Sequence, residues 1–220
     1  IDHKNGKKFL TDLEKNKWIS KNTFLPKKIK LIIDELNKDY WIENLSKLSK
    51  INNVFSTQVG NTELANYHEM ENDGYLGPHV DHSDDPDTGN PHVLNFLLYL
   101  SNEWHEEWGG STLLFDKNGK NILNEIKYVP NRAIIFLHTP YSFHGVKKIV
   151  NNQSKRLSIY VDYYSKSNDP YKNINLNFKK KWFKHGTYFV LPKTSDYFKI
   201  KNYNYIKTYI SYNVRRILFG

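Results

Sequence analysis

A histidine and an aspartate two positions apart are the first residues in this sequence whose types and spacing could do chemistry. His79 and Asp81 lie in the segment GYLGPHVDH, residues 74–82. If this segment is a strand, alternate side chains point to the same face, so His79 and Asp81 project together while Val80 is buried behind them. An imidazole and a carboxylate on one face would supply two sides of a metal site.

A third ligand is expected from a later strand-like run, SFHGV, which contains His144. Two histidines and one carboxylate occupy one triangular face of an octahedron and leave three positions open, which is the pattern of non-haem iron(II) oxygenases. A structural site closes its coordination, whereas an open one does chemistry. The chain has no cysteine, so thiolate metal sites, disulfides and a cysteine nucleophile are excluded.

Two alternatives compete for these ligand positions. His82 and Asp84 repeat the spacing three residues later, but they begin a run rich in Asp, Pro, Gly and Asn that is typical of a loop. His138, in the segment HTP, competes with the later ligand. Structural explanations also exist, since His79 with its aspartate could be a surface pair, and His144 could be a buried histidine bonded to the backbone.

Arg156 opens the run RLSIYVDYY and shares a strand face with Ser158. A guanidinium inside a β-barrel needs an anion, and it can hold a carboxylate through two parallel hydrogen bonds. A hydroxyl two residues further on can add a third hydrogen bond. The pair therefore suits one carboxylate of a dicarboxylate ligand. The structural alternative is a salt bridge from Arg156 to Asp162 or Glu125.

The elements that must position these residues change character along the chain. Residues 1–55 are predicted to be helical, with one helix beginning at Pro26 and a second short helix around residues 40–48. From about residue 62, short runs rich in β-branched and aromatic residues alternate with turn residues. Eight short strands without helices between them predict an antiparallel sandwich, jelly roll or barrel. The strands expected are 62–70, 75–81, 92–101, 111–116, 126–129, 133–137, 143–149 and 156–164.

We expect one domain, mainly β with N-terminal helices, because 220 residues are of single-domain size. It divides into a helical support over residues 1–61, a β core over 62–166 and a basic, aromatic extension over 167–220. Within the extension, residues 185–192 could form a strand. Residues 197–218 could form a helix or a clamp across the body.

The net charge of +9 belongs to the extension. Residues 171–220 carry nine Lys and two Arg against one Asp, which is 11 − 1 = +10, so the rest of the chain is near −1. Such a tail could hold an anionic partner or a membrane surface, or simply form a solvated face. No membrane-length apolar run and no signal-peptide pattern is visible, so a protein without a membrane span, in the cytoplasm or another intracellular compartment, is expected.

Six elements resemble the prolyl-hydroxylase-like branch of the 2-oxoglutarate/iron(II) oxygenases, in order and with suitable spacing over about residues 62–164. The resemblance implies a double-stranded β-helix, or jelly roll, with iron ligands at His79, Asp81 and His144. The matching elements are residues 66–67 (NY), 74–81, 97–101 (LLYLS), 108–114 (WGGSTLL), 144–146 (HGV) and 156–158 (RLS).

The resemblance also implies how a cosubstrate is held. Arg156, supported by Ser158, corresponds to the basic residue that pairs with the distal carboxylate of 2-oxoglutarate. Tyr99 and Tyr67 correspond to tyrosines that line or bond the cosubstrate, although a tyrosine on an inward strand face is also common core material. The basic residue lies 12 positions after the last expected iron ligand, a little farther than usual. Lys155 is therefore the alternative.

The implied enzyme is a dioxygenase that uses Fe(II), 2-oxoglutarate and O2, with ascorbate as a candidate reductant, and hydroxylates a substrate with release of succinate and CO2. The substrate is a prolyl or other protein side chain, or a small molecule such as a sugar or amino-acid derivative. A non-catalytic metal- or ligand-binding jelly roll is the alternative. Nucleic acid is not expected as a partner, because the body is near neutral and Asp162 stands where a repair oxygenase would carry a second arginine. The sequence leaves the oligomeric state open.

Overall fold

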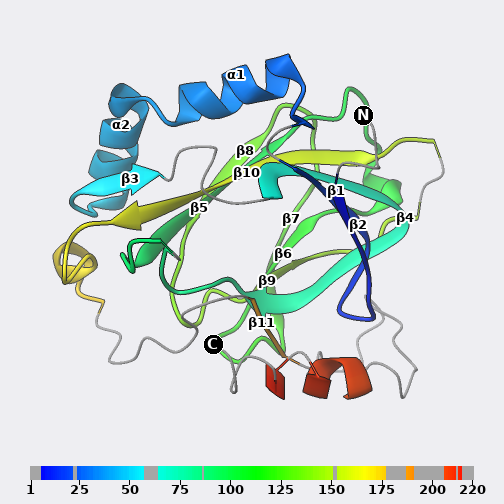
Figure 1. Ribbon diagram of the computed structural model, residues 1–220. Coiled ribbons are helices and arrows are strands. Elements are labelled where there is room, and N and C mark those ends of the chain that lie inside the picture. Colours follow the sequence, from blue (N-terminus) through cyan, green and yellow to red (C-terminus); the bar gives the residue numbers. More distant parts are fainter. Residues whose placement is uncertain are drawn as a thin grey trace.

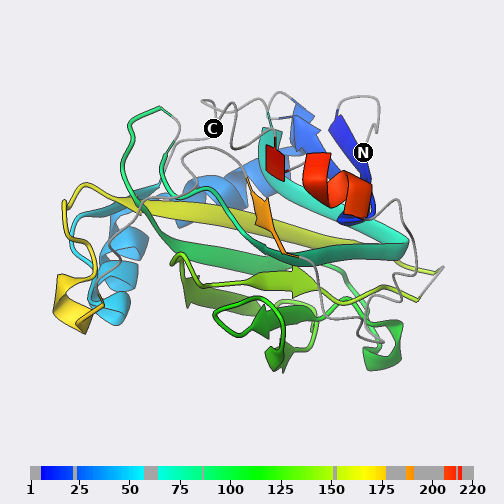
Figure 2. The ribbon, with the colours of Figure 1, turned by 90° about the horizontal axis from the view of Figure 1, so that it is seen from below.

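The structure is a computed structural model that describes residues 6–21, 24–56, 64–85, 87–150, 153–176, 187–190, 206–211 and 213–214. Within these residues the strands join into one antiparallel sheet that curls on itself, and two helices lie against one part of it (Figures 1 and 2). A mainly β chain with N-terminal helices and a jelly-roll core is thereby confirmed. No helix among the described residues has both the length and the apolar character to span a bilayer.

The main path of the sheet alternates strands from distant parts of the sequence. In spatial order it runs through β7 (Ile122–Ile126), β6 (Thr112–Phe115), β9 (His144–Val146), β4 (Leu64–Val80), β10 (Arg156–Ser165), β5 (His92–Tyr99) and β8 (Ala133–Leu137). Beside this path, β1 (Gly6–Leu10) pairs with β2 (Glu14–Lys21), β2 and β11 (Tyr188–Phe189) pair with β4, and β3 (Val54–Ser56) pairs with β10. Two single-turn 3₁₀ helices are η3 (Glu106–Trp108) and η4 (Lys172–Ile174).

The long strand β4 connects the two parts of the sheet. Its first half pairs with β10, and its second half pairs with β9 and β11. The sequence predicted two strands separated by a turn at residues 72–74. The structure instead keeps one bent strand, in which Asp73 has φ 65° and a Cβ atom on Gly74 would lie 2.7 Å from the carbonyl oxygen of Glu71. The strand continues because β2 pairs with it on both sides of the bend.

The hairpin from β6 to β7 closes earlier than predicted. The Asp116 carboxylate accepts backbone hydrogen bonds from Asn118 at 3.2 Å and Lys120 at 2.8 Å. This compact turn starts β7 at Ile122, whereas the sequence predicted a strand over 126–129. The strands predicted over 92–101, 111–116, 133–137, 143–149 and 156–164 coincide with β5, β6, β8, β9 and β10.

The two predicted helices are present as α1 (Lys27–Leu36) and α2 (Asp39–Ser49). Pro26 immediately precedes α1 with φ −54°, a value that the ring fixes and that suits a helix start. Lys50 ends α2 in the left-handed conformation, with φ 59°. Their apolar faces join the largest core cluster, which also contains Phe96 and Val161 of the sheet. The buried helical residues are Ile33, Leu36 and Leu45.

The prediction of helix was wrong for residues 6–21, which form the β1–β2 hairpin. Thr11 closes its turn, because its hydroxyl accepts backbone hydrogen bonds from Leu13 and Glu14 at 3.3 and 3.1 Å. The pairing of β2 with β4 then buries Trp18 to 4% and Ile19 to 5% of their accessible surface. This partner lies some fifty residues away in the sequence, and a local apolar period cannot reveal it.

The described parts of the C-terminal extension return to the sheet. The strand β11 falls within the range 185–192 that the sequence assigned to a strand. Residues 206–211 and 213–214 are helical, and Tyr209 packs against the cluster that contains Leu13 and Phe189. The Asn213 side chain donates to the Phe189 carbonyl at 3.3 Å. The other residues of 177–220, including most of the predicted helix or clamp, lie outside the described residues.

Candidate active site

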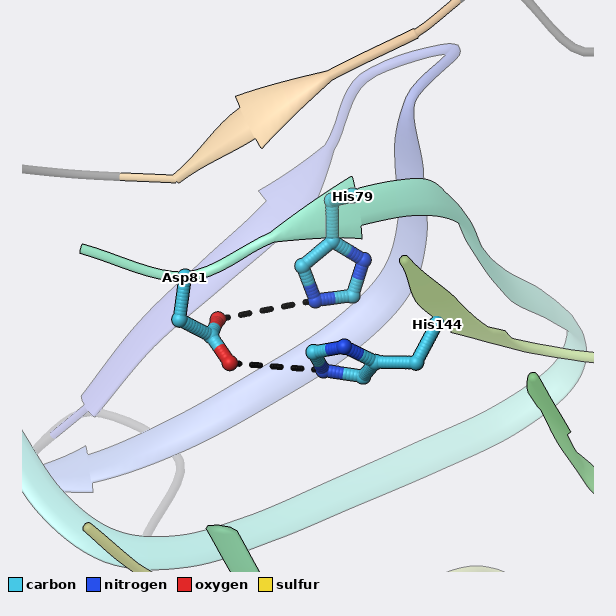
Figure 3. A group of neighbouring side chains, drawn as sticks. All are labelled: His79, Asp81 and His144. Atoms are coloured by element: carbon cyan, nitrogen blue, oxygen red, sulfur yellow. Dashed lines mark ion pairs between the residues drawn. The ribbon is translucent and has the colours of Figure 1, made fainter. Parts of the chain in front are cut away.

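The two sides of the candidate site meet where β9 pairs with β4. His79 and His144 are directly opposed in this antiparallel pair, and their ring centroids lie 4.2 Å apart. Asp81 directly follows β4 and turns its carboxylate toward both imidazoles (Figure 3). Val80, between the two ligand candidates in the sequence, is buried in a separate hydrophobic cluster. The alternation expected of a strand therefore places His79 and Asp81 together.

The three side chains converge on one another. Asp81 Oδ1 lies 3.6 Å from His79 Nε2, and Asp81 Oδ2 lies 3.3 Å from His144 Nε2 (Figure 3). One donor atom from each of the three lies within 4.8 Å of the others. The described residues add no fourth histidine or acidic side chain to this group. Two imidazoles and one carboxylate with open positions fit the donor set of a non-haem iron(II) centre.

Hydrogen bonds to the backbone orient both rings. His79 Nδ1 lies 2.8 Å from the Gly77 carbonyl oxygen, and His144 Nδ1 lies 3.0 Å from that of Ser142. A carbonyl oxygen can only accept, so each Nδ1 carries a proton, and each Nε2 is the ring atom that faces the carboxylate. The Asn95 side chain donates to Asp81 Oδ2 at 3.0 Å and fixes that carboxylate in turn.

Burial and mutual charge set the protonation of the group. Burial, together with the neighbouring His144, lowers the pKa of His79 to about 3, so His79 is neutral at physiological pH. Burial also opposes charge on Asp81 and His144. Their mutual attraction and hydrogen bond outweigh it, raising the pKa of His144 and holding the pKa of Asp81 well below its ordinary value. An ion pair of this kind holds a proton where a metal cation would bind.

Arg156 is a buried cation, with 2% of its surface exposed. Its Nε donates to the Gly110 carbonyl oxygen at 2.7 Å, and Nη1 and Nη2 lie 3.3 and 3.4 Å from the hydroxyls of Ser158 and Thr112. No described acidic side chain forms an ion pair with it, so the salt bridges to Asp162 or Glu125 are absent from the described residues. A buried guanidinium without an anion is costly, and a bound carboxylate would compensate it.

Two nearby ionisable side chains, Lys155 and Glu125, each form an ion pair away from Arg156. Lys155 pairs with Glu69 at 3.0 Å and has a side chain that is 41% exposed. Glu125 pairs with Lys147, at 2.9 Å. Lys155 therefore already has an acidic partner, whereas Arg156 lines the cavity beside the three candidate ligands.

Tyr99 and Tyr67 occupy different surroundings. Tyr99 is fully buried, its hydroxyl lies 2.6 Å from Thr112 Oγ1, and its ring centroid lies 5.1 Å from the Arg156 guanidinium carbon. Tyr67 packs in the core cluster with the helices and bonds Glu69 at 3.1 Å. Neither tyrosine lines the cavity, whereas His68, the residue after Tyr67, does. The strand parity of Tyr67 directs it away from the cosubstrate role that the sequence suggested, whereas Tyr99 lies behind Arg156.

A family model described as "2OG-Fe(II) oxygenase superfamily" matches residues 63–164. The matched range contains His79, Asp81, His144 and Arg156. Over this segment the chain is similar to the 2OG-Fe(II) oxygenase superfamily. The resemblance noted from the sequence is confirmed.

Individual relatives match this chain over a short segment or at low identity. Prolyl 3-hydroxylase OGFOD1 of Mus musculus is 32% identical over 78 residues, which are 34% of this chain and 14% of that protein. A prolyl hydroxylase from Trichoplax adhaerens, solved with a hypoxia-inducible-factor peptide, is 14% identical over 79% of this chain and 74% of that chain, with a TM-score of 0.48. HygX of Streptomyces hygroscopicus, solved with nickel, 2-oxoglutarate and hygromycin B, is 10% identical over 70% of this chain and 71% of that chain, with a TM-score of 0.45.

The oxygenase segment shares its cavity with the N-terminal hairpin. The cavity has a volume of about 750 Å³, and the three candidate ligands line it together with Arg156 and Ser158. The hairpin residues that line it include Phe9, Thr11, Glu14 and Lys17. Sequence reasoning missed this wall because it predicted a helix there.

Asn95 is a second residue of the oxygenase site that sequence reasoning missed. It lines the cavity and bonds Asp81. The signal was present in the sequence, since Asn95 is the one amide within the apolar run VLNFLL, residues 93–98. A buried amide in such a strand requires a polar partner, and here that partner is a candidate ligand.

The competing ligand positions lie beside the candidate triad of His79, Asp81 and His144. Asp84 is buried to 2% and forms a backbone bridge with Pro91, and the described group of ligand-type side chains around His82 does not include it. His138 stacks on His92, with ring centroids 3.9 Å apart and an interplanar angle of 9°. His82 instead faces His92 and an aspartate of β10.

Proposed function

We propose that this chain is an iron(II)- and 2-oxoglutarate-dependent hydroxylase. The observation that supports it is the placement, in one cavity, of an open group of two imidazoles and a carboxylate beside a buried arginine without an acidic partner among the described residues. When bound, iron and 2-oxoglutarate supply the oxidation, in which O2 yields a hydroxylated substrate, succinate and CO2. Ascorbate is proposed as the reductant that keeps the iron ferrous.

Each residue of the candidate site has a defined task in this proposal. His79, Asp81 and His144 hold the iron through nitrogens and oxygens that the backbone carbonyls and Asn95 already orient. Arg156 holds the distal carboxylate of 2-oxoglutarate through two parallel hydrogen bonds. Ser158 and Thr112 steady the guanidinium, and Tyr99 packs under it.

The substrate is proposed to be a prolyl or other protein side chain, with a small molecule as the second candidate. The first candidate is supported by the 32% identity over 78 residues to a protein named prolyl 3-hydroxylase. A cavity of about 750 Å³ accommodates either. We also propose that residues 62–166 form the oxygenase core, that residues 1–61 support it and that residues 167–220 extend it.

The test is cosubstrate turnover. Purified full chain is given Fe(II), ascorbate and 2-oxoglutarate, and succinate is measured while proline-containing peptides, amino acids and sugars are added in turn. Stimulated succinate release in the wild type and its loss in His79→Ala are expected. If no added compound raises succinate above the His79→Ala background, the hydroxylase proposal fails. A peptide that is both stimulating and 16 Da heavier afterwards identifies the substrate class by the mass of one added oxygen atom.

A further inference from the structure

A second cluster of ligand-type side chains lies beside the candidate iron site. It consists of His82, His92 and Asp162, and one donor atom from each lies within 4.8 Å of the others. His82 follows Asp81 directly in the sequence, His92 begins β5, and Asp162 lies in β10. Three separate segments thus converge on one point, and neither the proposed iron nor the proposed cosubstrate uses any of these residues.

The aspartate bridges the two imidazoles. Asp162 Oδ1 lies 3.5 Å from His92 Nε2, and Asp162 Oδ2 lies 3.9 Å from His82 Nε2. The three side chains are well enclosed, with exposures of 0% for His92, 15% for Asp162 and 21% for His82. No described residue donates a hydrogen bond to the Asp162 carboxylate. Accordingly, burial raises the pKa of Asp162 to about 7.

His92 has more oxygen neighbours than one proton can satisfy. Its Nδ1 lies 3.1 Å from the His82 carbonyl oxygen, and its Nε2 lies 3.2 Å from the Leu94 carbonyl oxygen. A neutral imidazole carries one N–H, so one nitrogen turns a lone pair toward oxygen. Full burial lowers the pKa of His92 and so opposes a second proton. The cluster is therefore rich in lone pairs and short of positive charge.

We propose that His82, His92 and Asp162 form a second site for a divalent cation of the zinc type, separate from the iron site. Two imidazole nitrogens and one carboxylate oxygen are a donor set that zinc accepts, with its fourth position left for water. The cation would fix the segment that follows Asp81 to β5 and β10. It would therefore hold His82, next to Asp81, in a fixed place beside the cavity.

One contact must give way when the cation binds. The Tyr164 hydroxyl lies 2.8 Å from His82 Nε2, the same nitrogen that faces Asp162. The cation replaces this hydrogen bond, so Tyr164 competes with the metal and does not ligate it. Substitution Tyr164→Phe removes the competitor while keeping the ring. Tyr164→Phe should therefore raise the affinity for the metal, whereas the loss of a ligand should lower it.

The experiment is a count of bound Zn²⁺ in metal-free full chain after equilibrium dialysis, by elemental analysis. The wild type is expected to bind two equivalents. The variant His79→Ala/His144→Ala should keep one, and the variant His82→Gln/Asp162→Asn should keep the other. An outcome of one equivalent that is lost with His79 and His144 overturns the second site. So does an undiminished count in His82→Gln/Asp162→Asn.

A stability readout separates this site from misfolding and from adventitious binding. In the His79→Ala/His144→Ala background, Zn²⁺ should raise the melting temperature, and added Asp162→Asn should abolish the rise. Adding Tyr164→Phe to that background should make Zn²⁺ bind more tightly, and weaker binding would contradict the site. The exposed pair of His105 with Glu103, 2.9 Å apart, provides the control, since His105→Gln should change nothing. A melting temperature insensitive to Zn²⁺ in that background would overturn the proposal. Turnover plays no part in this test, so the hydroxylase proposal can fail independently of it.

Discussion

The carbonyl oxygen of Gly110 accepts a hydrogen bond from Arg156 Nε at 2.7 Å, and the same glycine leaves room for the arginine side chain. Gly110 has φ +74°, and a Cβ atom there would lie 2.9 Å from the Trp104 ring and 3.3 Å from Arg156 Cδ. One residue thus supplies both an acceptor for the guanidinium and the space in which it lies. Its backbone conformation also suits glycine better than any other residue.

Replacing Gly110 with alanine should weaken both the fold and cosubstrate binding. The left-handed backbone costs about 2 kcal/mol for a residue with a Cβ atom. The added Cβ would also crowd the Arg156 side chain, and this displacement should raise the KM for 2-oxoglutarate. Urea denaturation and succinate release measure the two effects. Gly89→Ala is the matched control, because Gly89 has φ +69° with nothing within 4 Å of a built Cβ. The Gly89→Ala variant should lose stability without a change in KM. A rise in KM equal to that of Gly110→Ala would contradict the role given to Gly110.

Replacing Arg156 with glutamine should raise the KM for 2-oxoglutarate by at least roughly 100-fold, because the two charge-assisted hydrogen bonds contribute about 1.5–3 kcal/mol each. Arg156→Lys should recover little, since an ammonium cannot hold a carboxylate in the same bidentate way. Steady-state succinate release against 2-oxoglutarate concentration makes the measurement. Lys155→Gln is the control, and a larger effect there than at Arg156 would reverse the assignment.

Replacing Asn95 with alanine should weaken iron binding by roughly 10–100-fold, the usual cost of removing a residue that orients a ligand. Its side chain donates to Asp81 Oδ2 at 3.0 Å and holds the carboxylate toward the histidines. The Fe(II) concentration that gives half-maximal turnover provides the readout. Asn124→Ala on β7, an exposed position, should leave it unchanged. Equal Fe(II) dependence in wild type and Asn95→Ala would sink this prediction.

Replacing Asp73 with asparagine should lower stability only while Asp73 is ionised. Hydrogen bonds from Lys148 and Lys15 lower the pKa of Asp73, so its contribution is present above the unfolded value of about 3.9 and is lost as pH falls through the folded pKa. Asparagine tolerates the φ of 65°. The loss should not exceed about 1 kcal/mol at neutral pH, since the pair is partly exposed.

Urea denaturation of wild type and Asp73→Asn from neutral pH down to about pH 3 tests this pH dependence. The two curves should converge in acid, and high salt should shrink their separation at neutral pH. A separation that stays constant down to the acid end would mean that Asp73 acts through its backbone conformation and not through its charge.

The residues that sequence reasoning placed well are those fixed by local geometry. His79 and Asp81 lie together because side chains alternate along a strand, and this period extends over only a few residues. Pro26 marks the start of α1 for an equally local reason. The pairing of Arg156 with a ligand carboxylate was inferred from its side-chain chemistry and stays a prediction. These inferences required no knowledge of which strands are neighbours.

The misplaced residues depend on pairing between distant segments. The hairpin of residues 6–21 is rich in lysine and has no clear strand period, and its order comes from β4. Tyr67 was assigned to the cosubstrate although its parity on β4 buries it under the helices. Asn95 was overlooked because its partner Asp81 belongs to another segment of the chain, directly after β4, whereas Asn95 lies in β5. The pairing of His82 with Asp84 was considered from spacing alone, whereas His92 and Asp162 lie nearer in space.

The bend in β4 has a consequence for how this chain can change in length. Between Asp73 and His79 the strand is paired with β2 and then with β9, and its register with β9 shifts between Leu76 and His79, where three steps along β4 match two along β9. This irregularity sets which face His79 presents to β9. Inserting one more residue between Leu76 and His79 would exchange the faces of His79 and Val80 and displace a candidate ligand. Insertions should therefore be tolerated less in the residues from Leu76 to Asp81 than in the loop that follows Asp81.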